Sequence, residues 1–304
     1  MPRIGQEMRN AVPLTLTVII ACRNAADTLW LQLEALTRQS YRGPWEVIIS
    51  DNGSTDESRA IAERFRDRLP GFRIIDSSDQ PGAGPARNAA AAVARHDYLA
   101  FCDADDEVTP TWLEALGAAL AENTFIAGRF EPCKLNSARA YRSRPLQQSS
   151  GLQESPFGPD LPHAGAGNMA VRRDVFEAVG GFDAEVETLE DTDLCWRIQL
   201  AGSPLVFVPQ AIVHVRLRSS ATSVWRQGRA YGRAAALLET RYGKVSEDSR
   251  GSRQRAALHV RLFQLVRQGR HPVALLWVVA WHVGHRSLQP HAALSPLSRS
   301  AGAR

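Results

Sequence analysis

The sequence predicts an α/β fold with a mostly parallel, mixed sheet and helices on both faces of that sheet. Through the first 120 residues, short apolar segments rich in β-branched residues alternate with helix-like segments, which is the pattern of parallel sheets. With 44% hydrophobic and 22% charged residues, the composition is that of an ordinary globular protein. The length of 304 residues favours one large domain with an appendage over two equal domains.

Four strands are predicted in the first half of the chain, at residues 15–21, 46–50, 72–75 and 98–102. Apolar side chains at helical spacing predict a helix after the first strand, with Leu29, Leu33 and Leu36 on its inner face. Further helices are predicted around residues 57–65 and over residues 86–94.

The second half predicts fewer strands and then a helical extension. Strands are expected at residues 125–129, 167–172, 205–208 and 212–215, and helices at residues 174–179 and 192–200. Residues 133–165, rich in Arg, Ser, Gln and Pro, are expected to form a long irregular loop of the kind that often carries specificity. The pattern after Ser220 is helical, so we expect a main domain at residues 1–220 and an extension at residues 221–304, with a disordered tail from Ser287.

The charges are divided unevenly between these two parts. Residues 1–215 hold 20 basic and 29 acidic side chains, a net charge of −9, and residues 216–304 hold 16 basic and 3 acidic side chains, a net charge of +13. Together they give the formal net charge of +4. A basic C-terminal segment of this kind usually faces nucleic acid, a lipid surface or an acidic substrate.

The four cysteines are Cys22, Cys102, Cys133 and Cys195. Their wide spacing suits a reducing compartment and indicates neither a metal site nor a disulfide framework. Residues 19–22, Ile-Ile-Ala-Cys, resemble a lipoprotein cleavage site. The α/β pattern that follows needs this segment as its first core strand, and a core strand is therefore the prediction.

Polar clusters follow three predicted strands, at residues 23–24, 51–53 and 103–105. Ligands of open α/β sheets bind beyond the carboxyl ends of the strands. Alternate residues leaving a strand point the same way, so Asp103 and Asp105 can present two carboxylates to one point. Such hard oxygen ligands suit Mg²⁺ or Mn²⁺ shared with phosphates. The alternative is a polar turn in which the aspartates cap a helix.

Residues 82–88, Gly-Ala-Gly-Pro-Ala-Arg-Asn, follow a strand and open a helix. A dinucleotide-binding fingerprint would need a third glycine where Arg87 stands, and it would follow the first strand rather than the third. Small residues that let a helix end approach a phosphate, with Arg87 as a cation, are the other functional interpretation. A tight turn with a surface arginine is the structural alternative.

Residues 189–197 place several acidic side chains at a helix start, where the helix dipole favours them. Asp193 and Arg197 are spaced to pair on the helix surface. Asp191 is the candidate general base, because activating a hydroxyl nucleophile needs a carboxylate near the reacting carbon. The alternative is that Glu190 and Asp191 both cap the helix.

Six features in this order resemble the family 2 glycosyltransferases, the large GT-A group of inverting enzymes with a Rossmann-like sheet. They are residues 18–24, residues 47–56, residues 82–88, a DxD motif at residues 103–105, an acceptor-side segment at residues 167–176 and 179–183, and an ED motif at residues 190–191 with Arg197. The resemblance covers residues 14–218. It implies that residues 1–220 form a GT-A catalytic domain.

The resemblance also implies roles for individual residues. The implied nucleotide-sugar-binding residues are Ala21, Arg23, Asp51, Gly53, Arg87 and Asp103, the metal ligands are Asp105, Asp103 and His214, and the catalytic residues are Asp191 and Glu190. Asp51 would contact the base, Arg87 the diphosphate, and Asp191 would be the catalytic base. His214 lies in an otherwise apolar strand, where a structural role is the alternative. Ala21 and Cys22 depart from the Pro and small polar residue of many members.

The implied function is transfer of a sugar, with inversion, from a nucleoside-diphosphate sugar to an acceptor hydroxyl. A divalent cation, Mg²⁺ or Mn²⁺, would assist, and cell-wall, polysaccharide or glycolipid synthesis would be the setting. The acceptor would be a glycan, a lipid-linked molecule or another hydroxyl compound. The alternatives are a sugar nucleotidyltransferase and a non-catalytic module that binds nucleotide sugars or glycans.

The basic extension contains one amphipathic segment and one wholly apolar segment. Residues 254–268 show an amphipathic pattern, and residues 273–281 are nine apolar residues in a row, well short of the ~20 that span a bilayer. Arginines beside Trp and Leu fit peripheral contact with an anionic membrane, and the alternative is a helix packed on the catalytic domain. No nucleic-acid partner is expected, since no binding motif occurs. The expected location is the cytoplasm, with peripheral contact at the inner face of the plasma membrane.

Overall fold

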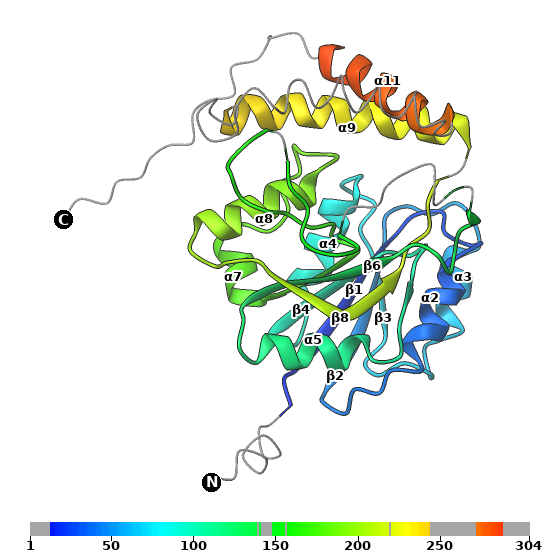
Figure 1. Cartoon of the computed structure of the whole chain (residues 1–304). Helices are drawn as coiled ribbons and strands as arrows, with labels where there is room; N and C mark the ends of the chain where they lie inside the picture. Colours follow the sequence, from blue (N-terminus) through cyan, green and yellow to red (C-terminus); the bar gives the residue numbers. More distant parts are fainter. Residues whose placement is uncertain are drawn as a thin grey trace, which may run out of the picture.

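The computed structural model describes residues 13–138, 140, 148–155, 157–218, 220–243 and 272–287. An eight-stranded sheet in the order β3-β2-β1-β4-β7-β6-β8-β5 runs through the molecule (Figure 1). Helices cover both faces of this sheet, and two further helices lie across one end of the body (Figure 1). The predicted α/β fold is confirmed.

The first four sheet positions form the parallel half that the sequence predicts. They are β3 (Arg73–Asp76), β2 (Trp45–Asp51), β1 (Leu16–Cys22) and β4 (Tyr98–Cys102). Leu16 to Ile20 are buried, so the segment resembling a cleavage site is a core strand, as predicted.

The other half of the sheet is mixed. It consists of β7 (Asn168–Arg172), β6 (Phe125–Glu131), β8 (Val206–His214) and the two-residue β5 (Glu107–Val108). Strand β7 runs antiparallel to both β4 and β6, whereas β6 and β8 are parallel. The strands predicted at residues 205–208 and 212–215 are one strand, because a register shift between Gly128 and Arg129 of β6 lets β8 continue through the break.

Each sheet face has its own apolar core and its own helices. One core lies beneath α2 (Leu29–Leu36), α3 (Ser58–Glu63) and α5 (Trp112–Leu120). The opposite core lies beneath α4 (Ala83–Ala92), α7 (Arg173–Ala178) and α8 (Glu190–Leu200). Within β1, Val18 and Ile20 belong to the first core and Ile19 to the second, as the alternation of side chains along a strand requires. The short β5 and helix α5 were not predicted.

The four cysteines are free thiols. Cys22, Cys102 and Cys195 are buried, in β1, β4 and α8, and Cys133 is exposed. Burial raises the pKa of Cys22 to about 11 and raises the pKa of Cys102 above its ordinary value.

The C-terminal helices α9 (Ala221–Tyr242) and α11 (Pro272–Ser287) lie side by side (Figure 1). Glycines allow their backbones to approach closely. A Cβ at Gly232 would lie 2.0 Å from the Trp281 carbonyl oxygen, and one at Gly284 would lie 2.1 Å from the Arg229 carbonyl oxygen. The predicted amphipathic segment 254–268 and the tail from residue 288 lie outside the described residues. No helix in the described parts of the chain has the length and apolar character needed to cross a membrane.

The glycine contacts predict that Gly232→Ala separates α9 from α11. We expect the free energy of unfolding to fall by about 1–3 kcal/mol, as overpacking of a close contact does. Urea denaturation followed by circular dichroism measures the change. Gly151→Ala is the control, because a Cβ there meets nothing within 4 Å. Equal stability of the two variants would contradict the close contact.

Candidate active site

The predicted donor-binding segments lie at the carboxyl ends of β1, β2 and β4. These strands are parallel neighbours, so their ends meet at one edge of the sheet, with Cys22 of β1 level with Asp51 of β2. Ala21 is half-buried at the end of β1, Arg23 is exposed just beyond it, and Gly53 has a φ of 75° in the turn after β2. The structure therefore gathers this part of the prediction at one rim.

Asparagine side chains hold the loops of this rim together. Asn24 Oδ1 accepts a hydrogen bond from the Thr55 backbone N–H, which ties the end of β1 to the turn after β2. Asn52 Nδ2 donates to the Gln80 carbonyl oxygen, and its Oδ1 accepts from the Gly82 N–H at 2.8 Å. The Asn52 bonds connect the end of β2 to the turn that opens α4. They fix Asp51, the residue before Asn52, relative to that turn.

Arg87 connects two other predicted site residues. Its guanidinium donates to Asp103 Oδ1 and to Glu190 Oε1, both at 2.8 Å. The side chain is buried and also lies over the Phe182 ring, 5.4 Å from the centroid. Burial acts to lower the pKa of Arg87, but Asp103 and Glu190 outweigh it and raise the pKa above its ordinary value. Arg87 is thus a buried, charged link and not the surface arginine of the structural alternative.

The end of β4 carries a group of three carboxylates. Ligand oxygens of Asp103, Asp105 and Asp106 lie within 4.8 Å of one another. Burial, with Asp103 as a neighbour, raises the pKa of Asp105 and raises the pKa of Asp106 well above its ordinary value. A cation at this point would relieve the crowding of negative charge. Asp106 was not predicted as a member, although its place directly after the DxD motif was the available signal.

Neighbouring elements hold this acidic loop in shape. The buried Gln32 of α2 donates to the Asp103 carbonyl oxygen and accepts from the Val108 N–H. Asp106 Oδ1 accepts from the Arg216 N–H at 2.8 Å. A Cβ at Gly167 would lie 2.5 Å from Asp103 Oδ2, so a larger residue here would displace the carboxylate of the first aspartate.

Glu190 and Asp191 form the first turn of α8. Asp191 Oδ1 accepts from the Thr192 N–H at 2.8 Å, and its Oδ2 accepts from the Ala166 N–H at 3.2 Å. Glu190 pairs with Arg87 instead of capping the helix, which starts after Leu189 without a side-chain cap. Burial raises the pKa of Asp191, and burial together with Asp191 raises the pKa of Glu190 to about 7.

One predicted contact differs from what the structure shows. Asp193 and Arg197 do pair, at 2.7 Å, but Asp193 is fully buried and the pair does not lie on the helix surface. His214 Nδ1 lies 2.6 Å from Glu131 Oε2. Among the residues that the structure describes, the carboxylate group at the end of β4 does not include His214, and its metal-binding role stays a prediction.

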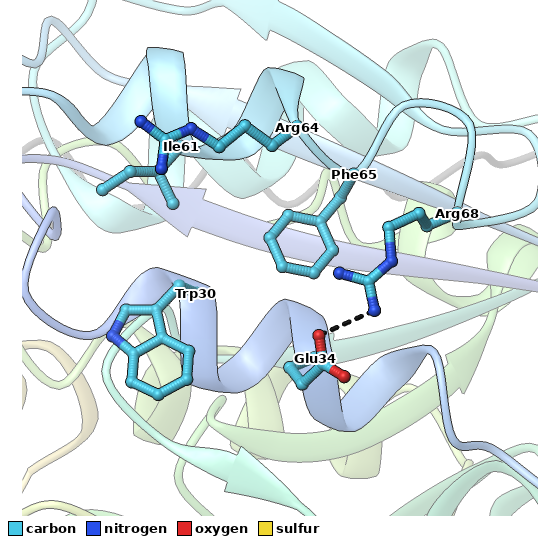
Figure 2. A pocket seen from close by; sticks show the side chains of 6 residues that line it. All are labelled: Trp30, Glu34, Ile61, Arg64, Phe65 and Arg68. Atoms are coloured by element: carbon cyan, nitrogen blue, oxygen red, sulfur yellow. Dashed lines mark hydrogen bonds and ion pairs between the residues drawn. The ribbon is translucent and has the colours of Figure 1, made fainter.

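A separate pocket of about 340 Å³ lies between α2 and α3 (Figure 2). Its lining residues are Trp30, Glu34, Ile61, Arg64, Phe65 and Arg68. Arg68 binds Glu34 at 2.8 Å and lies over the Phe65 ring. None of the predicted site residues lines this pocket, so the site is defined by the rim and not by this pocket.

An open α/β sheet with a carboxylate group and a half-buried acidic helix turn at one rim is the architecture of a GT-A enzyme. The family model "Glycosyl transferase family 2" matches residues 17–180, and the model "Glycosyl transferase family group 2" matches residues 143–300. The first match covers more than half of the chain. The protein belongs to glycosyl transferase family 2.

Relatives and solved structures agree with this assignment. The uncharacterized glycosyltransferase YibD of Escherichia coli is 34% identical over 46% of this chain and 42% of its own length. Glycosyltransferase AglE of Haloferax volcanii is 29% identical over 67% of each chain. The mannosyltransferase PcManGT of Pyrobaculum calidifontis, solved with GDP-Man and Mn²⁺, has the same fold, with a TM-score of 0.62 at 17% identity over 91% of this chain and 88% of its own. This chain thus spans less than half the length of YibD.

The raised pKa of Glu190 predicts how stability depends on pH. Between its ordinary pKa of 4.5 and the folded value of about 7, the folded protein holds a proton that the unfolded chain has released. Stability therefore falls as the pH rises through this window. Glu190→Gln removes this contribution, so the variant should gain stability relative to the parent from pH 4.5 to pH 7.

Urea unfolding of both proteins across this pH range, without added metal, measures the difference. Parallel stability curves would show that the Glu190 pKa is not raised.

Proposed function

We propose that the protein transfers a sugar from a nucleoside-diphosphate sugar to an acceptor hydroxyl, with inversion at the anomeric carbon. The observation that supports this best is the double ion pair of Arg87. It joins Asp103, at the donor-binding rim, to Glu190, beside the candidate base. The residues proposed to bind the donor and to accept the proton therefore lie near one another, which supports a single in-line displacement.

The donor set at the end of β4 fits a divalent cation. Asp103 and Asp105 would hold it, with Asp106 close by, because carboxylate oxygens are the ligands that Mg²⁺ and Mn²⁺ prefer. When bound, such a cation offsets negative charge on the departing diphosphate. PcManGT was solved with Mn²⁺ and a nucleotide sugar, which supports the same type of cofactor here. His214 remains a proposed further ligand.

The protein's own residues would divide the remaining work. Asp51 would bind the base of the nucleotide, beside Ala21, Arg23 and Gly53, and Arg87 would stabilise the diphosphate. Asp191 would take the proton of the acceptor hydroxyl, because the Ala166 and Thr192 N–H groups hold its carboxylate in place. Burial raises the pKa of Asp191, which makes it a stronger proton acceptor than an exposed aspartate.

The test of this function is Asp191→Asn. A thermal-shift screen of UDP-, GDP- and dTDP-sugars with Mn²⁺ first identifies the donor. We expect Asp191→Asn to lower transfer by about 10²–10⁴-fold while donor affinity stays within about threefold, because the amide cannot accept the proton but keeps the shape. Nucleoside-diphosphate release measures turnover, and titration calorimetry measures donor binding.

Asp67→Asn, at an exposed position of the same domain, is the control. Loss of donor binding in Asp191→Asn would remove Asp191 from the role of base. Donor binding without turnover in the parent protein would favour a non-catalytic binding module. Release of pyrophosphate from a nucleoside triphosphate and a sugar phosphate would favour a nucleotidyltransferase.

We further propose that the C-terminal helices contact an anionic membrane from the cytoplasmic side. Leu275, Val279 and Val283 are exposed, and their spacing of four residues places them along one side of α11. Arg286 is exposed on the same helix, and the C-terminal part of the chain is strongly basic. An apolar stripe with nearby cations is the arrangement of helices that lie at a lipid surface.

Flotation with liposomes tests this contact. Full-length protein should float with vesicles that contain anionic lipid and stay behind with neutral vesicles. Replacing Leu275, Val279 and Val283 together by Asn should abolish flotation, whereas Leu200→Asn, at an exposed leucine of α8, should not. Equal flotation of the triple variant and the parent would end the proposal.

A further inference from the structure

The turn that begins α8 is strained. Leu189 has φ 61° and ψ 23°, the left-handed conformation, although it is not glycine. Leu189 directly precedes Glu190 and Asp191. A non-glycine residue keeps this conformation only when surrounding contacts impose it, so the presentation of the two acids depends on what holds the turn.

Three donors surround the next acid of the helix. Asp193 is fully buried. Its Oδ2 accepts from Arg197 Nε at 2.7 Å, and its Oδ1 accepts from Arg241 Nη1 at 3.0 Å and from the Tyr242 hydroxyl at 2.7 Å. A buried carboxylate is tolerated only with such partners. Two of the three donors belong to the last residues of α9.

Arg241 also reaches the segment before the strained turn. The same Nη1 atom lies 2.6 Å from Asp183 Oδ2, and Nη2 lies 3.6 Å from Glu185 Oε2. One guanidinium therefore bridges Asp183, before Leu189, and Asp193, after it. The chain between these two aspartates contains the whole Glu190–Asp191 turn.

Apolar contacts support this ionic bridge. The Tyr242 ring meets Trp196 of α8 edge to face, with centroids 5.3 Å apart. Leu238 of α9 is fully buried in the same cluster as Trp196, and Leu189 packs against that cluster. Helix α9 thus contacts the helix that follows Leu189 and the segment that precedes it, and it shares an apolar cluster with Leu189.

We propose that Arg241 and Tyr242 are positioning residues for the reaction, which hold the Glu190–Asp191 turn in its reactive geometry from the C-terminal helix. The proposal rests on the proposed function. The hydrogen bonds and ion pairs described for these two residues go to Asp183, Glu185 and Asp193 and not to the rim. A displacement of the base by about 1 Å is enough to lower turnover strongly. Asp51 and Asp105 lie on other elements, and Arg87 is the proposed donor-binding residue that contacts the turn, through Glu190. We therefore expect the larger effect on turnover and the smaller one on donor binding.

The experiment compares Tyr242→Phe and Arg241→Gln with Arg226→Gln, which changes an exposed arginine of the same helix. Tyr242→Phe removes only the hydroxyl that donates to Asp193 and keeps the ring against Trp196, so it leaves the apolar packing in place. Amide hydrogen exchange of residues 189–193 reports on the turn. Steady-state release of nucleoside diphosphate from the sugar nucleotide found in the thermal-shift screen reports on kcat and on the donor KM.

For Tyr242→Phe and Arg241→Gln we expect the amide hydrogen-exchange rate of residues 189–193 to rise by about tenfold or more, because opening the turn breaks its hydrogen bonds. We expect kcat to fall by about tenfold or more with donor KM within about threefold of the parent. Arg226→Gln should match the parent in all three quantities.

An unchanged amide exchange rate at residues 189–193 in both Tyr242→Phe and Arg241→Gln would overturn the proposal, and so would an unchanged kcat. If the variants lose thermal stability only and keep a normal kcat at a temperature where they are folded, that result would likewise contradict the proposal and give the contacts a purely structural role. If the parent turns over no sugar nucleotide, the proposed function fails instead, and the exchange data show separately whether α9 holds the turn.

Discussion

The buried guanidinium of Arg87 is the interaction on which the site depends. It stands between carboxylates of two elements that are distant in sequence, Asp103 after β4 and Glu190 at the start of α8. Burying several carboxylates together is unfavourable unless a cation accompanies them. With Arg87 in place, Asp103 at the rim and Glu190 at the start of α8 can occupy the same small region. Without its charge, mutual repulsion would favour their separation.

Much of this arrangement could be predicted because it depends on local patterns. The β-branched strands at β1, β2 and β4 and the polar turns after them are local features, and parallel strands necessarily bring such turns to one edge. The sequence therefore placed Asp51, Asp103 and Asp105 at a common rim without any coordinates. The small residues of 82–88 likewise predicted that Arg87 opens a helix, although its two carboxylate partners came only from the structure.

The remaining features depend on contacts between distant parts of the chain. Asp193 was expected on the helix surface because an acid and an arginine four residues apart commonly pair there. Its burial comes from Arg241 and Tyr242, about fifty positions further along, and no local pattern indicates that. Helix α9 was predicted to begin an appendage because its contacts with α8 also join distant parts of the chain. Its sequence is basic and has a helical pattern, but its last turn packs against α8.

The burial of three thiols determines how this protein reacts with alkylating reagents. Cys22, Cys102 and Cys195 lie in β1, β4 and α8, which are the elements that carry the rim and the acidic turn. Burial raises the pKa of each of them, which keeps the sulfur protonated and poorly nucleophilic. Alkylating reagents can modify these sulfurs only during transient opening of the surrounding elements. The rate at which each thiol is labelled therefore measures how often the surrounding elements open. Mass spectrometry can follow this rate without an introduced probe.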